Sequence, residues 1–220
     1  MRTIVTSDVH LGSRHCAGET FLRFLRALPP DAALVLNGDT VNYQPHFTPP
    51  QREVLAALRK ESLRRPVVWV RGNHDARYRL EDPARIDFRD AYALDHRLYV
   101  AHGHQFEHLT SRYAFVLSFF RAVYRLRCLF YAETVHVASY ARKFPVLYRL
   151  LQDHVAHNAV ELARREGFSG VACGHTHTPE ERSENGIRYF NTGAWTENSP
   201  CCLVVNDDDM RLRPAAEIAA

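Results

Sequence analysis

Short apolar runs recur along the first hundred residues of the chain and again near its C-terminus. Runs of this length, bounded by polar or turn-forming residues, predict β-strands. The run at 67–70 is apolar throughout, which is typical of a strand that is covered on both faces. Strands are predicted at 3–6, 33–36, 67–70, 97–101, 171–173, 187–191 and 201–206, with 211–213 closing a hairpin across 207–209.

Between the early strands, apolar residues are spaced three or four positions apart, which indicates amphipathic helices. The first helix carries its apolar residues within 21–28 and ends before Pro29 and Pro30. The second begins at Thr48, which can cap the helix while Gln51 bonds back to it. Strands that alternate with helices predict a protein of the α/β class.

A long helical stretch interrupts this alternation before the last strands. Residues 113–140 are apolar nearly all round, and Pro145 then begins an amphipathic helix that Gly167 is placed to cap. Residues 111–150 contain ten aromatic residues, and seven basic residues against one acid, a local net charge of +6 in a chain of +3. We therefore expect a single domain over 1–220 whose α/β body carries a helical insertion.

Composition limits the class of protein. The 220 residues are 46% hydrophobic and 24% charged, which is ordinary for a globular domain and excludes disordered and fibrous chains. The most apolar run, 114–120, is far shorter than the roughly 20 residues of a membrane-spanning helix. Five cysteines without a C-x-x-C pair predict reduced, buried thiols and a cytoplasmic location.

Chemically active side chains directly follow five successive predicted strands. The carboxyl ends of strands are where α/β sheets build their sites, and glycines there let the backbone approach a ligand closely. One such motif alone fits a turn or a cap, but five in chain order predict one shared site. The motifs are Asp8-x-His10, Gly38-Asp39, Gly72-Asn73-His74-Asp75, His102-Gly103-His104 and Gly174-His175-x-His177.

These side chains are ligands of hard and borderline metal ions. Carboxylate, amide and imidazole groups without Cys suit Mn²⁺, Fe or Zn²⁺. Seven of these side chains are candidate ligands, which is too many for one tetrahedral ion, so we predict two metal ions that share one bridging carboxylate. The seven are Asp8, His10, Asp39, Asn73, His102, His175 and His177. Asp39, in the central motif, is the candidate bridge.

The series of motifs resembles that of the calcineurin-like metallophosphoesterase superfamily over nearly the whole chain apart from 108–165. Residues 7–13 and 173–193 are similar to the UDP-2,3-diacylglucosamine hydrolase branch of that superfamily. The resemblance implies a four-layer α-β-β-α sandwich of two mixed β-sheets, with residues 108–165 forming a helical lid.

The resemblance also implies a role for each site residue. A hydroxide that bridges two divalent ions, with Mn²⁺ preferred, would attack phosphorus. His74 would stabilise the transition state or protonate the leaving oxygen, and Asp75 would orient His74. One metal ion would be held by Asp8, His10, Asp39 and His177, and the other by Asp39, Asn73, His102 and His175.

Two arginines are candidate ligands of a substrate phosphate. Arg14 and Arg77 each follow a metal motif closely, and a guanidinium can bind phosphate as a fork. The basic, aromatic lid has three interpretations: a helical hairpin with solvated arginines, a cleft for acyl chains, or a contact with nucleic acid.

We therefore expect a hydrolase of a small-molecule phosphodiester or pyrophosphate, such as UDP-2,3-diacylglucosamine or a related nucleotide-linked lipid. Its lid would make a peripheral contact with the inner face of the membrane. The lipid enzymes of the branch tend to carry Arg where this chain has His74, and Gly-Asp where it has Gly103-His104. The alternatives are a generic phosphoesterase, a nuclease, which the mild net charge disfavours, and a metal-binding scaffold, which the complete ligand set disfavours.

Overall fold

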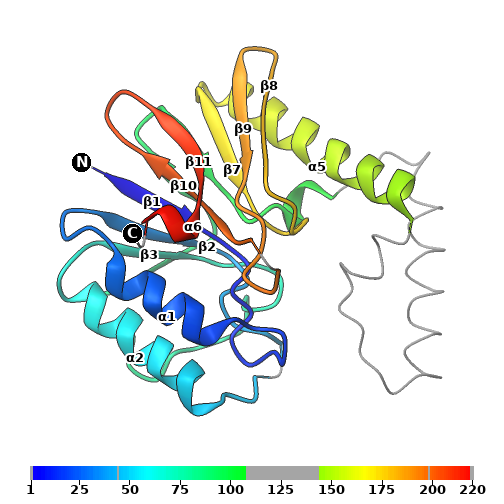
Figure 1. Cartoon of the computed structure of the whole chain (residues 1–220). Helices are drawn as coiled ribbons and strands as arrows, with labels where there is room; N and C mark the ends of the chain where they lie inside the picture. Colours follow the sequence, from blue (N-terminus) through cyan, green and yellow to red (C-terminus); the bar gives the residue numbers. More distant parts are fainter. Residues whose placement is uncertain (1, 44, 108–143, 198, 219–220) are drawn as a thin grey trace.

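The computed structural model of the chain describes residues 2–43, 45–107, 144–197 and 199–218. Two mixed β-sheets pack against one another, and helices cover their outer faces (Figure 1). The α/β sandwich predicted from the sequence is therefore confirmed. Residues 108–143, which hold most of the predicted lid, lie outside the described residues.

The first sheet has the strand order β11-β10-β1-β2-β3-β4. Its centre is parallel, whereas β10 and β11 return as an antiparallel hairpin beside β1. Helices α1 (Gly18–Ala27) and α2 (Pro49–Ser62) cover its outer face. The strands are β1 (Thr3–Thr6), β2 (Ala33–Asn37), β3 (Val67–Val70), β4 (Asp87–Arg89), β10 (Cys201–Val205) and β11 (Met210–Pro214).

The second sheet has the strand order β5-β6-β7-β9-β8. Helix α5 (Pro145–Arg165) covers its outer face, where Val155 and Ala159 share an apolar cluster with Val171 and Tyr189. The strands are β5 (Tyr92–Leu94), β6 (Leu98–Val100), β7 (Gly170–Cys173), β8 (Glu180–Glu184) and β9 (Ile187–Asn191). Short helical turns η1 (His104–Phe106) and α6 (Ala215–Ile218) complete the described elements.

Successive side chains of a strand point to opposite faces of its sheet, so the strands contribute to two separate apolar layers. Leu34 and Leu36 of β2 face the helices, while Val35 between them faces the second sheet, where Val100 and Phe190 meet it. Each such buried side chain contributes about 1.5–3 kcal/mol relative to an exposed one. Because β3 is covered on both faces, its sequence, Val-Val-Trp-Val, is a continuous apolar run.

All strands predicted from the sequence are present, within about one residue at their ends. Three short strands, β4, β5 and β8, and the helix α6 were not predicted. The sequence of β8 is Glu-Glu-Arg-Ser-Glu, which has no apolar residue because the strand lies at the edge of its sheet. At the start of α2, the backbone N–H of Thr48 donates to Gln51 Oε1 at 3.0 Å, as the motif predicts.

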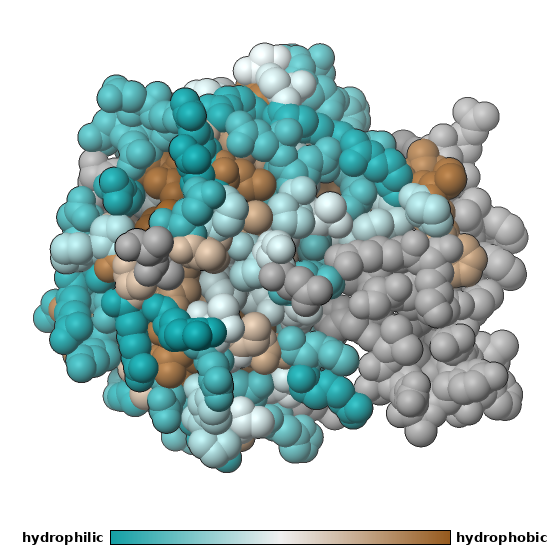
Figure 2. Space-filling view, viewed as in Figure 1, coloured by the Kyte–Doolittle hydropathy of each residue, from teal (hydrophilic) through white to brown (hydrophobic). Residues whose placement is uncertain are grey.

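Helix α5 is the described part of the predicted lid. Its C-terminal half is buried against β7 and β9, so this half forms a layer of the sandwich. Its first turns are exposed: Val146 is 75% exposed, and Figure 2 shows hydrophobic surface at this end of the helix. The extent of the insertion stays a prediction. Among the described helices, none has the length and apolar character needed to cross a membrane.

Candidate metal centre

The predicted ligands follow the carboxyl ends of β1, β2 and β3 in one sheet and of β6 and β7 in the other. The fold brings these ends together. Three groups of side chains each place their candidate ligand atoms within 4.8 Å of one another. These groups are Asp8 with His10 and His177, Asp39 with His102 and His175, and His10 with Asp39 and His74.

The first group surrounds Asp8. Its Oδ1 atom lies 3.1 Å from His177 Nε2 and 3.7 Å from His10 Nε2. The two imidazole Nε2 atoms are 3.3 Å apart. All three side chains are buried, and Asp8 is inaccessible to solvent. Three ligand atoms thus converge on one small volume.

The second group surrounds Asp39. Its Oδ2 atom lies 3.2 Å from His102 Nε2 and 3.9 Å from His10 Nε2, so this one carboxylate contacts both groups. Its Oδ1 atom accepts a hydrogen bond from the backbone N–H of His74 at 2.7 Å. His102 is held by a 2.8 Å hydrogen bond from Nδ1 to the carbonyl of Asn37, which leaves Nε2 toward Asp39. The Asp39 carboxylate thus lies between His10 and His102.

Backbone strain is concentrated at these residues. Eight non-glycine residues in the described part of the chain have positive φ, a conformation that costs about 1–3 kcal/mol and recurs at functional sites. Five of the eight are predicted ligands. They are Asp8, His10, Asp39, His175 and His177, with φ between 50° and 64°.

Two glycines make room for the carboxylates. A Cβ atom on Gly72 would lie 2.2 Å from Asp39 Oδ1, and one on Gly174 would lie 2.2 Å from Asp8 Oδ2. Real Cβ atoms do not approach so closely. The glycines of the Gly-Asn-His-Asp and Gly-His-x-His motifs are therefore needed because a carboxylate packs directly on the backbone there.

The site is electrostatically negative at its centre. Burial by itself raises the pKa of Asp8, but His177 and His102 outweigh burial and hold that pKa well below its usual value. Burial lowers the pKa of His102, but Asp39 and Asp8 oppose it and raise the pKa to about 10. Two ionised carboxylates in a buried site require positive charge beside them.

The residues present fit divalent metal ions. The side-chain oxygen of Asn73 is buried without a hydrogen-bond partner, and so is Asp8 Oδ1. A buried oxygen of this kind lowers the stability of the fold unless a hydrogen-bond donor or a cation binds to it. The donor set of carboxylate, amide and imidazole groups suits Mn²⁺, Fe or Zn²⁺ and does not distinguish between them.

His74 lies beside the second group, with its Nε2 atom 3.9 Å from Asp39 Oδ2. Its Nδ1 atom contacts Asn42 Oδ1 at 2.7 Å, and the ring of Tyr43 lies over it at 4.1 Å between centroids. Burial lowers the pKa of His74 to about 4, although Asp39 opposes this. The metal-free protein therefore holds a neutral imidazole here at pH 7.

The structure differs from the sequence prediction at Asp75. Its carboxylate accepts hydrogen bonds from the backbone N–H groups of Gly72 at 2.7 Å and Thr40 at 2.8 Å, and from the indole of Trp69 at 3.0 Å. These donors occupy the oxygens, so Asp75 ties the loops after β2 and β3 together. The partner of His74 is Asn42 instead.

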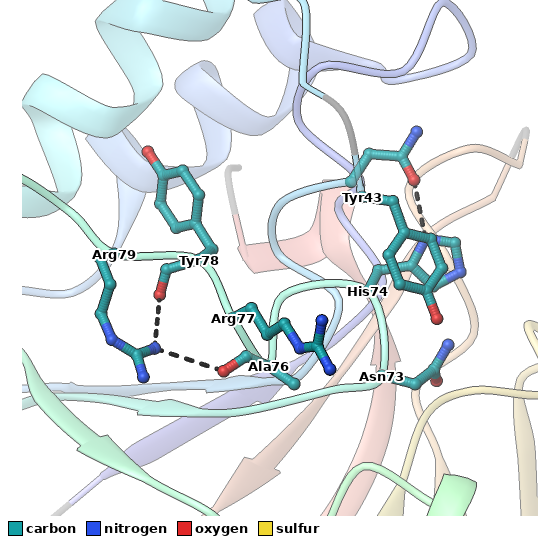
Figure 3. A pocket seen from close by; sticks show the side chains of 8 residues that line it. Tyr43, Asn73, His74, Ala76, Arg77, Tyr78 and Arg79 are labelled. Carbon is teal, nitrogen blue, oxygen red and sulfur yellow. Dashed lines mark hydrogen bonds between the residues drawn. The ribbon is translucent and has the colours of Figure 1, made fainter.

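A cavity of about 590 Å³ opens beside His74 (Figure 3). Asn73 and Arg77 also line it, and the guanidinium of Arg77 extends toward Asn73. Arg14 does not line this cavity; it borders a separate hollow of about 360 Å³ near the starts of α1 and α2. Of the two arginines, only Arg77 shares a cavity with His74.

Two residues of the site were not predicted from the sequence. Asn42 contacts His74, and Glu107 Oε1 lies 2.7 Å from His175 Nε2. Neither residue belongs to a strand-end motif, so the spacing of motifs carried no signal for them. Only the folded loops bring them to the imidazoles.

The described fold is a two-sheet α/β sandwich with Asp, Asn and His side chains gathered at its strand ends. The family model described as calcineurin-like phosphoesterase matches residues 1–179. The chain belongs to this family, and it is a phosphoester hydrolase by that membership.

Solved structures of low sequence identity share the fold. An archaeal phosphodiesterase is 14% identical with a TM-score of 0.51, covering 97% of this chain and 99% of its own. The phosphoesterase Yfce from E. coli is 18% identical with a TM-score of 0.50, covering 99% and 94%. A single mutant of Vps29 from Entamoeba histolytica is 14% identical with a TM-score of 0.51, covering 97% and 98%. No curated protein matches the chain.

Proposed function

We propose that this chain is a dinuclear-metal phosphoesterase that cleaves a phosphodiester or pyrophosphate bond. The observation that carries the proposal is the position of Asp39, whose Oδ2 atom lies 3.2 Å from His102 Nε2 and 3.9 Å from His10 Nε2. One carboxylate between two groups of imidazoles is the arrangement that two metal ions with a shared ligand require.

In this proposal, the two groups divide the ligands between the ions. When bound, two divalent ions supply a water of lowered pKa and positive charge against the phosphate oxygens. Because Asp8 and Asp39 are buried, bulk water would screen the field of bound ions only weakly. One ion would be held by Asp8, His10, Asp39 and His177, and the other by Asp39, Asn73, His102 and His175.

His74 is the proposed catalytic residue. It lies at the border between the ligands and the cavity, and Asn42 and Tyr43 fix its ring. When Nε2 carries a proton, it can donate a hydrogen bond from this position to an oxygen of the reacting phosphate and stabilise charge that develops there. Arg77 lines the same cavity and can bind a second phosphate oxygen as a fork.

The proposed substrate is a small molecule, UDP-2,3-diacylglucosamine or a related nucleotide-linked lipid. Support comes from the motif stretches 7–13 and 173–193 and from the basic, aromatic composition of 111–150, which suits acyl chains next to phosphate. We accordingly propose a cytoplasmic enzyme with a peripheral membrane contact through its lid. Arg14 is the second proposed phosphate ligand. It borders the hollow near the starts of α1 and α2 and does not line the cavity beside His74.

Hydrolysis by the metal-reloaded protein tests the proposal. The protein is stripped of metal, reloaded with Mn²⁺, and assayed on bis(p-nitrophenyl) phosphate, on p-nitrophenyl phosphate and on a UDP-linked diacyl sugar. Two bound ions per chain with strong preference for the UDP-linked lipid are expected. Turnover of the generic esters alone would retain the chemistry and reject the lipid substrate. No turnover with two ions bound would favour a scaffold.

A further inference from the structure

Glu107 and His175 form a close pair beside the second ligand group. Glu107 Oε1 lies 2.7 Å from His175 Nε2, and the two side chains are 23% and 16% exposed. An ionised carboxylate accepts hydrogen bonds and cannot donate them. In the tautomer that carries its proton on Nε2, His175 donates a hydrogen bond to this carboxylate, and Nδ1 has the lone pair that a metal ion requires.

His175 belongs to the group that contains Asp39 and His102, whose ligand atoms lie within 4.8 Å of one another. His102 has an outer partner of the same kind, because its Nδ1 atom bonds to the carbonyl of Asn37 at 2.8 Å. Both imidazoles of this group thus have one ring nitrogen held by the protein. Such outer hydrogen bonds fix the tautomer and the ring orientation of a metal-binding histidine.

The backbone that carries Glu107 is itself well supported. Phe106 is buried in the cluster that α5 forms with the second sheet, and its carbonyl accepts a 2.9 Å hydrogen bond from Asn158 on α5. The N–H of Glu107 bonds to the carbonyl of His104 at 3.3 Å. A carboxylate on a fixed turn loses little additional freedom when it holds His175.

We propose that Glu107 is a positioning residue of the second metal ion, which fixes His175 in the tautomer that presents Nδ1 as the ligand atom. The inference rests on the proposed dinuclear centre and deepens it. It predicts that the two metal ions depend differently on Glu107. Loss of an outer partner of this kind weakens metal binding by about 10- to 100-fold. The ion held by Asp8, His10 and His177 is not expected to change.

Titration of Mn²⁺ into the metal-free protein by calorimetry tests the inference without any measurement of turnover. Glu107→Ala is expected to weaken one of two Mn²⁺ sites by about 10- to 100-fold and to leave the other unchanged. Glu107→Gln is expected to retain more affinity, because the amide oxygen still accepts a hydrogen bond from Nε2. An equal loss of Mn²⁺ affinity in the Gln and Ala variants would overturn the proposal. It would indicate that the ionised carboxylate of Glu107 binds the metal ion itself.

A matched control separates positioning from a general structural role. Glu184→Ala breaks a comparable pair, His157 Nδ1 with Glu184 Oε1 at 2.6 Å, which joins the exposed surfaces of α5 and β8. Both Mn²⁺ affinities should be unchanged in this variant. If Glu107→Ala weakens both sites equally, or neither, the inference is wrong. Wild-type protein that binds two ions but hydrolyses no phosphoester would refute the proposed function while leaving this test intact.

Discussion

Asn42 supports His74 through a contact of 2.7 Å between Asn42 Oδ1 and His74 Nδ1. The partner is a neutral amide, so it orients the imidazole without adding negative charge to a site that already holds Asp8 and Asp39. An amide can also serve either tautomer of the ring, by its oxygen or by its nitrogen. Nε2 of His74 is thereby directed to the metal ligands, 3.9 Å from Asp39 Oδ2.

Replacement of His74 by Ala should lower turnover of bis(p-nitrophenyl) phosphate by about 10²- to 10⁴-fold, because the reacting phosphate loses a positioned imidazole. Metal content, measured by elemental analysis, should stay at the wild-type value because His74 is not a proposed ligand. His154→Ala, which changes an imidazole on α5, serves as the control with unchanged turnover. A wild-type rate in His74→Ala would remove His74 from the mechanism.

Replacement of Asn42 by Ala should lower kcat by about 10-fold with little effect on KM, because it frees the ring of His74. Asn42 is expected to act only through His74. The same substitution in the His74→Ala background should therefore have no further effect, which a double-mutant cycle would reveal. Additive losses in the double variant would show that Asn42 contacts the substrate itself.

Gly72→Ala and Gly167→Ala should have different consequences. A Cβ atom at Gly72 would meet Asp39 Oδ1 at 2.2 Å, so we expect loss of metal binding and of activity. Gly167 follows α5 with φ of 79° and open space around it, so Ala there should cost about 1 kcal/mol of stability through strain alone. Urea unfolding and metal analysis of both variants check this. Retained metal in Gly72→Ala would contradict the described packing.

The metal-free protein should be most stable near pH 6.5. Burial lowers the pKa of His102, but Asp39 and Asp8 oppose this and raise it to about 10, so the folded state keeps a proton that the unfolded state loses above 6.5. Stability should fall as pH rises from 6.5 toward 10. Burial lowers the pKa values of His74 and His104 to about 4, so stability should also fall as pH drops from 6.5 toward 4.

Urea unfolding in the presence of a chelator, repeated between pH 5 and pH 10, measures this dependence. His102→Gln should flatten the alkaline side of the curve and leave the acidic side in place. A stability maximum at pH 9 would contradict the assignment of a raised pKa to His102.

The cysteine thiols of the sandwich should react slowly in the folded protein. Burial raises the pKa of Cys16 and of Cys202 to about 12, and it raises that of Cys173 as well. Alkylation at pH 8, followed by peptide mass spectrometry, should label these three positions slowly in buffer and rapidly in urea, because the thiolate is the reactive form. Rapid labelling of Cys173 in the native protein would contradict its burial.

The buried parts of the fold were predictable from the sequence because a buried strand or helix face requires apolar residues at a regular spacing. The central strands are mostly apolar, and 67–70 is apolar throughout; the residues that follow several of them are the ones that converge at the site. The edge strand β8 was missed because an exposed edge needs no apolar residue.

The orienting contacts of the site were less predictable than its candidate ligands. The family resemblance implied that Asp75 orients His74, yet backbone N–H groups and Trp69 occupy its oxygens. Asn42 takes that role from another loop. Such contacts depend on how two loops meet in space, which hydrophobic periodicity does not encode.

The candidate ligands are divided between the two sheets: Asp8, His10, Asp39 and Asn73 follow strands of the first, and His102, His175 and His177 follow strands of the second. Neither sheet alone carries a complete binding set for either ion. The complete set of ligands for each proposed ion therefore forms only when the two sheets are packed together. A bound metal pair would connect residues of both sheets and would stabilise the packing of one sheet against the other.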